Sequence, residues 1–186
     1  MKCLIMLIGL PGAGKTTLAK KIAELYDCDF FSSEIIGAQI DGYQSVKEDR
    51  DFSVSKQEEI YEKLSRDVFA SLQTRKVVVE GVFRSKHQRQ KIDTIYERMK
   101  ENCPALEYIK FWITCDTKIA IERVKRRKNQ GTISPAGSNT LLEVSKQYDF
   151  PADNEGFIII DNSANLDDAI NRISTYIDAR IRSDRK

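Results

Sequence analysis

Four residues near the start of the chain have the types and spacing of a phosphate-binding loop. The stretch GLPGAGKTT satisfies the pattern G-x-x-x-x-G-K-[S/T] at Gly9, Gly14, Lys15 and Thr16. Glycines let successive backbone N–H groups turn toward an anion, and a helix that begins at the loop points its partial positive end at the same place. A lysine adds a mobile full charge, and a threonine hydroxyl suits Mg²⁺. The pattern therefore predicts a site for a nucleoside triphosphate and a magnesium ion.

The segments on either side of the loop support this interpretation. Glycine and proline between apolar segments usually mark a turn, but a turn does not need glycine, lysine and threonine at fixed offsets. Residues 3–8 form a short apolar run typical of a buried parallel strand, and Leu18, Ile22 and Leu25 then repeat at helical spacing. The residues expected to contact the triphosphate from this loop are Gly9, Pro11, Gly12, Ala13, Gly14, Lys15, Thr16 and Thr17.

The composition is that of one globular domain. The chain has 186 residues, of which 41% are hydrophobic and 31% are charged, and its net charge is +2. A nearly neutral charge gives no general electrostatic case for nucleic-acid binding, although a local basic patch stays open. No apolar run approaches the ~20 residues of a membrane span, and the four cysteines lack metal-ligand spacing. We therefore expect no membrane association, reduced thiols and a cytoplasmic location.

Strand-like and helix-like stretches alternate along the chain. Repeated strand–helix units imply a parallel sheet with helices on both faces, so the sequence predicts a three-layer α/β/α fold with a five-stranded parallel sheet. The expected strands are residues 3–8, 29–32, 76–81, 106–115 and 156–163. Beyond the loop helix, the expected helices are residues 55–72, 85–99, 117–128, a short stretch ending near 148 and a last stretch from 165, with Ser55 and Ser85 as caps.

Residues that directly follow the expected strands are candidates for a functional site. In an open parallel sheet, ligands bind beyond the carboxyl ends of the strands. This rule does not depend on the glycine pattern, so it selects candidates on separate grounds. The candidates are Ser33 and Glu34 after the second strand, Glu80 and Arg84 after the third, Arg123 and Arg127 after the fourth, and Asn162 and Ser163 after the fifth.

Each of the two carboxylates has a functional and a purely structural interpretation. Glu80 follows three valines and suits a ligand of Mg²⁺ opposite the loop, but it could instead cap the next turn. Glu34 could accept the proton of a hydroxyl acceptor, but it could instead be an acid that the dipole favours in the first turn of a short helix. We favour the functional interpretation for both.

The two arginines share one helix face because they are four residues apart. Arg123 and Arg127 could bind triphosphate oxygens or offset charge on a transferring phosphoryl group. Alternatively, the stretch RVKRRK is a set of cations favoured near a helix C-terminus. The loop-like residues 129–140 contain two glycines and a proline, which is typical of a closing lid. We therefore favour a role at the site.

With these residues in place, the chain resembles a particular branch of the P-loop kinases. The branch contains polynucleotide 5′-hydroxyl kinases, chloramphenicol phosphotransferase and zeta toxins. The stretches that carry the resemblance are GLPGAGKTT, SSEIIG (aligned with S-S-D-x-x-R), VVVEG, ERVKRR, TISPAG and IIIDNS. The similarity spans nearly the whole chain and implies one kinase domain over residues 1–186, with an acceptor-side segment at about 34–73 and a lid at about 123–148.

The resemblance also implies a reaction. ATP and Mg²⁺ would sit on the loop, with Thr16 and Glu80 at the metal. Adenine would lie between the base of the lid helix, at Arg123, and the loop around Asn162 and Ser163. Glu34 would receive the proton of the acceptor, while the lysine and the two arginines stabilise the phosphoryl group in flight. The residues expected to contact the acceptor are Ser33, Glu34, Glu80 and Arg84.

The chain departs from the pattern of this branch at four positions. Glu34 and Glu80 replace aspartates, Gly37 replaces an arginine, and Pro135 replaces the aspartate of the lid's S-D-A. The leading hypothesis is an ATP-dependent kinase that phosphorylates a hydroxyl of a small molecule or of a polynucleotide 5′ end. A nucleoside monophosphate kinase should carry arginines at 34–50, where only Arg50 occurs. A non-catalytic ATP-binding switch is a third hypothesis, supported by the missing arginine at position 37.

Overall fold

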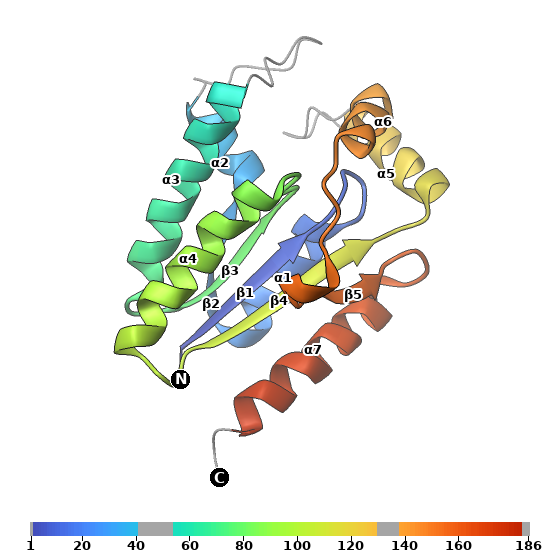
Figure 1. Ribbon diagram of the computed structural model, residues 1–186. Helices are drawn as coiled ribbons and strands as arrows, with labels where there is room; N and C mark the ends of the chain where they lie inside the picture. Colours follow the sequence, from blue (N-terminus) through green and yellow to red (C-terminus); the bar gives the residue numbers. More distant parts are fainter. Residues whose placement is uncertain (1, 41–53, 130–137, 184–186) are drawn as a thin grey trace.

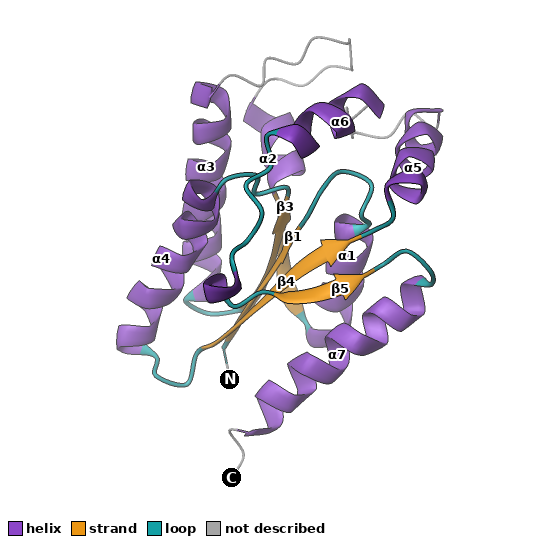
Figure 2. Cartoon of the chain, turned by 45° about the vertical axis from the view of Figure 1, so that its right-hand side comes forward, coloured by secondary structure: helices purple, strands orange, loops and turns teal. Residues whose placement is uncertain are grey.

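The computed structural model describes residues 2–40, 54–129 and 138–183. Its centre is a five-stranded parallel sheet with the strand order β2-β3-β1-β4-β5 (Figure 2). The strands are β1 (Cys3–Ile8), β2 (Cys28–Ser32), β3 (Lys76–Gly81), β4 (Glu107–Thr114) and β5 (Ile158–Asp161). β1 pairs with β3 on one side and β4 on the other, and the connections that leave the neighbouring strands β1 and β3 run in opposite directions across the sheet, to β2 and to β4. Ligands bind at such a switch point.

Helices cover both faces of the sheet, so the three-layer fold is confirmed (Figure 1). Helices α1 (Lys15–Tyr26) and α7 (Leu166–Ser183) pack on one face, and α3 (Val54–Leu72) and α4 (Lys86–Asn102) pack on the other. Alternation along β1 fills both layers: Ile5 and Leu7 join the core under α1 and α7, and Leu4 and Met6 join the core under α3 and α4.

Three further helices lie at the end of the sheet where the strands terminate. Helix α2 (Ser33–Ile40) follows β2 directly, while α5 (Thr117–Asn129) and α6 (Ser138–Lys146) lie side by side and pack through Ala120, Val124 and Leu141 (Figure 1). Within residues 123–148, where a lid was expected, α5 and α6 therefore pack against each other. Residues 130–137, with Pro135, and residues 41–53 of the acceptor-side segment lie outside the described part of the chain.

Some expected boundaries differ from the structure. Ser85 caps α4 as predicted, since its hydroxyl accepts the N–H of Gln88 at 3.3 Å. The prediction that Ser55 caps α3 was wrong: the helix begins at Val54, which places Ser55 inside the first turn. The last strand, Ile158–Asp161, is shorter than the expected 156–163, because Gly156, with φ 72°, forms the C-cap of a short 3₁₀ helix, Asp153–Glu155, and lies outside the strand.

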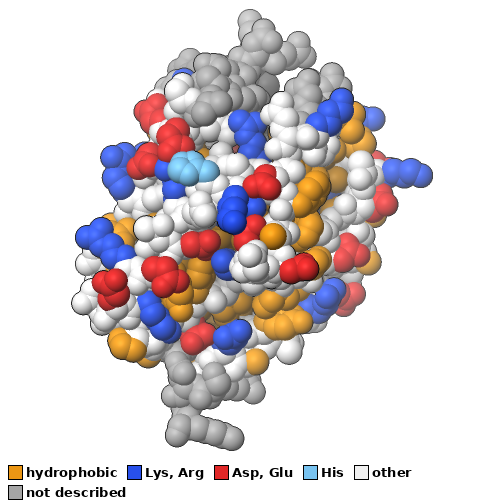
Figure 3. Space-filling model, viewed as in Figure 1, with side chains coloured by type: hydrophobic (Ala, Val, Ile, Leu, Met, Phe, Trp, Pro, Cys, Tyr) orange, Lys and Arg blue, Asp and Glu red, His pale blue; other side chains and the backbone are white. Residues whose placement is uncertain are grey.

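On the face shown in Figure 3, lysine and arginine side chains are interspersed with aspartate and glutamate. This distribution agrees with the net charge of +2. Among the described helices, none is both long enough and apolar enough to cross a membrane.

Candidate active site

The phosphate loop leaves the end of β1 in a conformation that requires glycine. Gly12 and Gly14 have φ angles of 84° and 92°, a region that side chains disfavour. A Cβ on Gly12 would lie 2.5 Å from the carbonyl oxygen of Ala120, and one on Gly14 would lie 2.3 Å from Nδ2 of Asn162. The glycines therefore allow the loop to approach α5 and the end of β5 closely. α1 begins at the next residue, Lys15, so its N-terminus faces the same space.

Asn162 ties the loop to the end of β5. Its side chain is buried, and its Nδ2 donates a hydrogen bond to the carbonyl oxygen of Ala13 at 2.8 Å. The neighbouring Ser163 is directed elsewhere: its hydroxyl accepts the N–H of Asp116 at 2.8 Å and donates to Asp161. Both residues were predicted beside the nucleotide. The structure places Asn162 against the phosphate loop and Ser163 at the junction of β4 and α5.

Lys15 is buried at the centre of the site. Its Nζ donates to the carbonyl oxygen of Leu10 at 3.0 Å, which holds the charge within the loop. Burial lowers the pKa of Lys15, and the charges of Glu80 and Glu34 act in the opposite direction. The positive charge of Arg127 also acts on this amine. Lys15 therefore lies within electrostatic range of three of the predicted site residues.

Glu80 joins β3 to the phosphate loop. Its Oε1 accepts hydrogen bonds from the hydroxyls of Ser32, at 2.5 Å, and Thr16, at 3.2 Å. Only 2% of Glu80 is exposed, and this burial raises its pKa, with the charge of Lys15 opposing the rise. A hydroxyl and a carboxylate are hard oxygen ligands, so Thr16 and Glu80 suit Mg²⁺. The described residues contain no group of three or more His, Cys, Asp or Glu side chains that could hold a metal. Mg²⁺ commonly needs only one or two carboxylates together with phosphates and water.

Glu34 lies in the first turn of α2, as the structural interpretation expected, but one of its carboxylate oxygens has no partner among the described residues. Its Oε1 is buried and has no hydrogen-bond partner. The charge of Glu34 acts on both Lys15 and Glu80. Buried polar atoms are nearly always paired, so the unpaired oxygen of Glu34 needs an explanation.

The other acceptor-side candidates surround a residue that sequence reasoning missed, Tyr61 of α3. Its hydroxyl accepts the N–H of Phe83 at 2.9 Å and also has a hydrogen bond with Ser33. Burial raises the pKa of Tyr61 to about 12, and the charges of Glu80 and Arg84 also act on it. Tyr61 therefore connects the start of α2 with the loop after β3. Its signal in the sequence was a polar hydroxyl on the apolar face of a predicted helix.

The structure supplies a reason for glycine at position 37 that the surrounding sequence did not reveal. Gly37 is buried, and a Cβ at this position would lie 3.1 Å from Cδ1 of Ile60. Gly37 thus allows α2 to pack closely on α3. The arginine expected from the resemblance is absent at a position where a long side chain would meet the core.

The two arginines of α5 face the site differently. Arg123 donates from NH1 to Sγ of Cys115 at 3.4 Å, and this NH1 would lie 3.7 Å from a Cβ on Gly14. Arg123 is thus beside the phosphate loop, and the charge of Arg127 reaches Lys15. Arg126, on another face, is exposed. The structure places Arg123 beside the loop and Arg127 within electrostatic range of Lys15.

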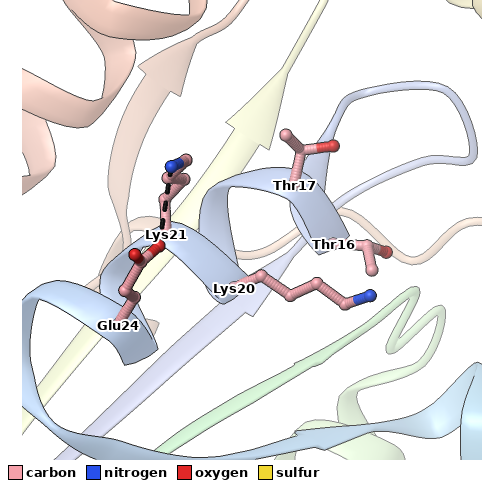
Figure 4. Close-up of a pocket in the computed structure, with 5 residues that line it drawn as sticks. All are labelled: Thr16, Thr17, Lys20, Lys21 and Glu24. Carbon is pink, nitrogen blue, oxygen red and sulfur yellow. Dashed lines mark hydrogen bonds and ion pairs between the residues drawn. The ribbon is translucent and has the colours of Figure 1, made fainter.

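A shallow pocket adjoins the loop along α1 (Figure 4). Its volume is about 290 Å³, and it is lined by Thr16, Thr17, Lys20, Lys21 and Glu24. Thr16 and Thr17 come from the first turn of α1, and the other lining residues follow one or two turns later. Lys21 forms an exposed ion pair with Glu24 at 3.5 Å. The pocket therefore lies beside the phosphate loop on the solvent side of the helix.

Comparison with known proteins identifies the family to which the chain belongs. The family AAA_17, described as an AAA domain, matches residues 8–141, from the end of β1 to α6. This chain belongs to that AAA domain family. The match includes the phosphate loop, Glu34, Glu80 and both arginines of α5. No curated protein sequence matches this AAA domain protein. The narrower resemblance to polynucleotide kinases, chloramphenicol phosphotransferase and zeta toxins stays a prediction.

Solved structures share the fold of this AAA domain protein over almost their full length. A sugar kinase from Janibacter sp. HTCC2649 has a TM-score of 0.68 and 16% identity over 96% of this chain and 95% of its own. A protein from Chloroflexus aurantiacus has a TM-score of 0.74 and 20% identity, with 96% and 98% covered. A gluconokinase from Sinorhizobium meliloti 1021 has a TM-score of 0.55 and 17% identity, with 93% and 94% covered. At these identities the likeness shows a shared fold.

Proposed function

We propose that this protein is an ATP-dependent kinase that transfers the γ-phosphoryl group to a hydroxyl of a small molecule. The observation that carries the proposal is the unpartnered Oε1 of Glu34, held near Lys15 at the phosphate loop. A triphosphate on the loop has its terminal group close to Lys15. A carboxylate with a free oxygen at this place suits a base for the attacking hydroxyl.

In this proposal the backbone N–H groups of the loop and Lys15 bind the β- and γ-phosphates. Asn162 fixes the loop through Ala13, and Arg123 and Arg127 stabilise negative charge on the phosphoryl group. Mg²⁺, held by Thr16 and Glu80, would neutralise charge on the phosphate oxygens.

The transfer itself exchanges one phosphorus–oxygen bond for another. The acceptor oxygen bonds to the γ-phosphorus, and the bond from the γ-phosphorus to the bridging oxygen of ADP breaks. The hydroxyl proton passes to the free oxygen of Glu34. The products are ADP and a phosphate monoester of the acceptor.

Three observations favour a small-molecule kinase over the other hypotheses. The net charge of +2 gives no general attraction for a polynucleotide. The close packing of Gly37 on Ile60 explains the missing arginine without a loss of activity. This explanation weakens the case for a non-catalytic switch. The fold shared with a sugar kinase and a gluconokinase supports the same class of acceptor. The motifs quoted above support a place in the polynucleotide kinase, chloramphenicol phosphotransferase and zeta-toxin branch.

The test is phosphoryl transfer by the purified protein with ATP, Mg²⁺ and a panel of hydroxyl acceptors. Glu34→Gln is expected to lower kcat by about 10²- to 10⁴-fold, the usual contribution of a general base. ATP affinity, measured by calorimetry, should stay within about twofold of the parent protein. Glu97→Gln is the matched control because Glu97 is exposed on α4. ATP binding without any phosphorylated product, or full activity in Glu34→Gln, would contradict the proposal.

A further inference from the structure

Among the described residues, Oδ1 of Asn162 is buried without a hydrogen-bond partner, and so are three oxygen atoms of elements on the acceptor side. These three are Oε1 of Glu34, Oε1 of Gln88 and the phenol oxygen of Tyr148. Gln88 and Tyr148 are only 6% and 5% exposed. Leaving such an atom unpaired costs about 1–3 kcal/mol, so each one needs an explanation. A ligand that supplies the missing partners is one explanation, provided that the three atoms belong to one site.

Hydrogen bonds made by these residues, or by their neighbours in sequence, connect all three to Tyr61 and its helix α3. Ser33, next to Glu34, has a hydrogen bond with the hydroxyl of Tyr61. Gln88 donates from Nε2 to Gln57 at 3.0 Å, and Gln57 is one helical turn before Tyr61 on α3. The N-terminal ends of α3 and α4 and the start of α2 lie at the same end of the sheet (Figure 1).

Tyr148 reaches this place from the lid side. The next residue, Asp149, donates its N–H to the carbonyl oxygen of Arg84 at 2.8 Å, and Arg84 adjoins Phe83, which donates to Tyr61. Tyr148 and Tyr61 are also close enough for their charges to interact. The segment after α6 therefore brings a phenol to the acceptor side of the site.

This segment is held firmly, which fixes the position of the phenol. Arg89 of α4 is 1% exposed and donates to the carbonyl oxygens of Asp149, at 2.7 Å, and Phe83, at 3.3 Å. It also forms two hydrogen bonds with Glu155, at 2.7 and 2.9 Å. One buried guanidinium thus holds both the segment after the lid and the loop that carries Arg84.

We propose that Tyr148 and Gln88 bind the acceptor beside Glu34, and that the acceptor is a small polyhydroxylated molecule. The inference rests on the proposed kinase function and adds a substrate class to it. A carboxylate oxygen and an amide oxygen only accept hydrogen bonds, whereas a phenol can also donate. A hydroxyl group can do both, so several hydroxyls on one small carbon skeleton would satisfy all three atoms. One hydroxyl meets Glu34 and is phosphorylated, while others bind Gln88 and Tyr148.

Neighbouring side chains cover these atoms, so the acceptor reaches them only when the side chains around Tyr61 move apart. Opening and closing around the substrate is common in enzymes with a lid. The two contacts are therefore expected to affect the binding of the acceptor and to leave ATP binding unchanged.

The test measures phosphorylation by the full chain with ATP, Mg²⁺ and three sets of probes. The sets are polyols (aldoses, alditols and aldonates), oligonucleotides with a free 5′-hydroxyl, and nucleoside monophosphates. We expect phosphorylation within the polyol set. For the best polyol, Tyr148→Phe should raise the acceptor KM by about 3- to 10-fold, the worth of one lost hydrogen bond. The KM for ATP should not change, and Tm should stay constant or rise because an unpaired buried hydroxyl is removed.

Tyr26→Phe is the matched control for this variant. The Tyr26 hydroxyl donates to Asp178 at 2.9 Å, on the opposite face of the sheet. Its loss should lower Tm and leave both KM values unchanged, which is the reverse of the pattern expected for Tyr148→Phe.

Each other outcome has a defined meaning. An unchanged acceptor KM in Tyr148→Phe would overturn the assignment of that residue. Phosphorylation of oligonucleotides or monophosphates alone would overturn the polyol inference while leaving a kinase. ATP binding without transfer to any probe would remove the proposed function and this inference together.

Discussion

The hydroxyl of Thr16 donates a hydrogen bond to the carboxylate of Glu80 at 3.2 Å. This contact links the phosphate loop to the end of β3, and the adjacent pairing of β1 with β3 makes it geometrically accessible. The same carboxylate oxygen is held by Ser32 at the end of β2. The predicted metal ligands therefore meet at the carboxyl edge of the sheet before any ligand binds.

Glu80→Gln should weaken the binding of ATP with Mg²⁺ and leave metal-free ATP binding nearly unchanged. The amide can still accept from Ser32 and Thr16, but it lacks the negative charge that Mg²⁺ prefers. Loss of one interaction with a charged group predicts about 10- to 100-fold weaker binding in the presence of Mg²⁺. Calorimetric titration with ATP, with Mg²⁺ or with EDTA, measures both affinities. Equal loss in the two conditions would argue against a metal role for Glu80.

Asn162→Asp should weaken ATP binding by disturbing the phosphate loop. The side-chain amide donates to the carbonyl oxygen of Ala13 at 2.8 Å, and a carboxylate would place two acceptors face to face in a buried position. The unmade bond predicts a loss of about 1–3 kcal/mol, some 5- to 100-fold in affinity. Fluorescent-nucleotide titration provides the measurement.

Asn165→Asp introduces the same chemical change and is expected to be neutral. Asn165 lies in an exposed turn before α7, where its Oδ1 accepts the N–H of Asp167 at 3.0 Å. Asparagine and aspartate are equally good at such a position. A similar loss of ATP affinity in both variants would show that added charge, not the contact with Ala13, is responsible.

The Arg89–Glu155 pair should make stability depend on pH in the acid range. Burial raises the pKa of Glu155, but hydrogen bonds from Arg89 and from the backbone of Ala152 outweigh this effect and hold it below the usual 4.5. A depressed pKa adds stability that is fully present above the unfolded value and is lost as pH falls through the folded value. Urea unfolding between pH 3 and 7, at intervals of about half a pH unit, would detect the loss.

Glu155→Gln should flatten this dependence, because the amide does not titrate. Arg89→Met should cost about 3–5 kcal/mol at neutral pH, since it removes the cationic partner of the buried Glu155 carboxylate, which keeps only the N–H of Ala152. An identical pH profile in Glu155→Gln and the parent protein would refute the role assigned to the pair.

Substitutions at Gly37 should separate packing from function. Gly37→Ala gains about 1 kcal/mol of helix propensity, but its methyl group presses on the end of the Ile60 side chain, so the two effects nearly cancel. Gly37→Arg should destabilise the protein by more than about 2 kcal/mol, because a long charged chain cannot be accommodated between α2 and α3. Thermal unfolding gives the measurement. Recovery of stability in Gly37→Arg combined with Ile60→Ala would confirm the steric reason, and a stable Gly37→Arg would contradict it.

Much of the fold and of the candidate site could be predicted because the signals are local. The strand, loop and helix around GLPGAGKTT occupy one continuous stretch, and glycine at positions 12 and 14 is required by the backbone of that stretch. The alternation of strands and helices then implies a parallel sheet, and parallel strands end at one edge. From this rule alone, Glu34, Glu80 and Asn162 were predicted to lie at the same edge of the sheet as the phosphate loop.

Other features depend on contacts between distant parts of the chain. In the sequence, Tyr61 is one more residue of an amphipathic helix. Only the fold places its hydroxyl between Ser33 and Phe83. In the sequence, Gly37 stands where an arginine was expected. Only the fold shows that Ile60 of α3 packs against this position. The error at Ser55 has a related cause, since the local pattern of a cap is compatible with more than one starting residue.

The sequence by itself determined the phosphate loop, the layered architecture and the edge of the sheet where chemistry would occur. These follow from backbone sterics and from the spacing of apolar residues, which act over a few positions. Only the tertiary structure decided which polar atoms are satisfied and which are left free. Satisfaction of a buried atom depends on whether a partner from another element arrives within about 3 Å in the right direction, and local sequence does not encode that distance.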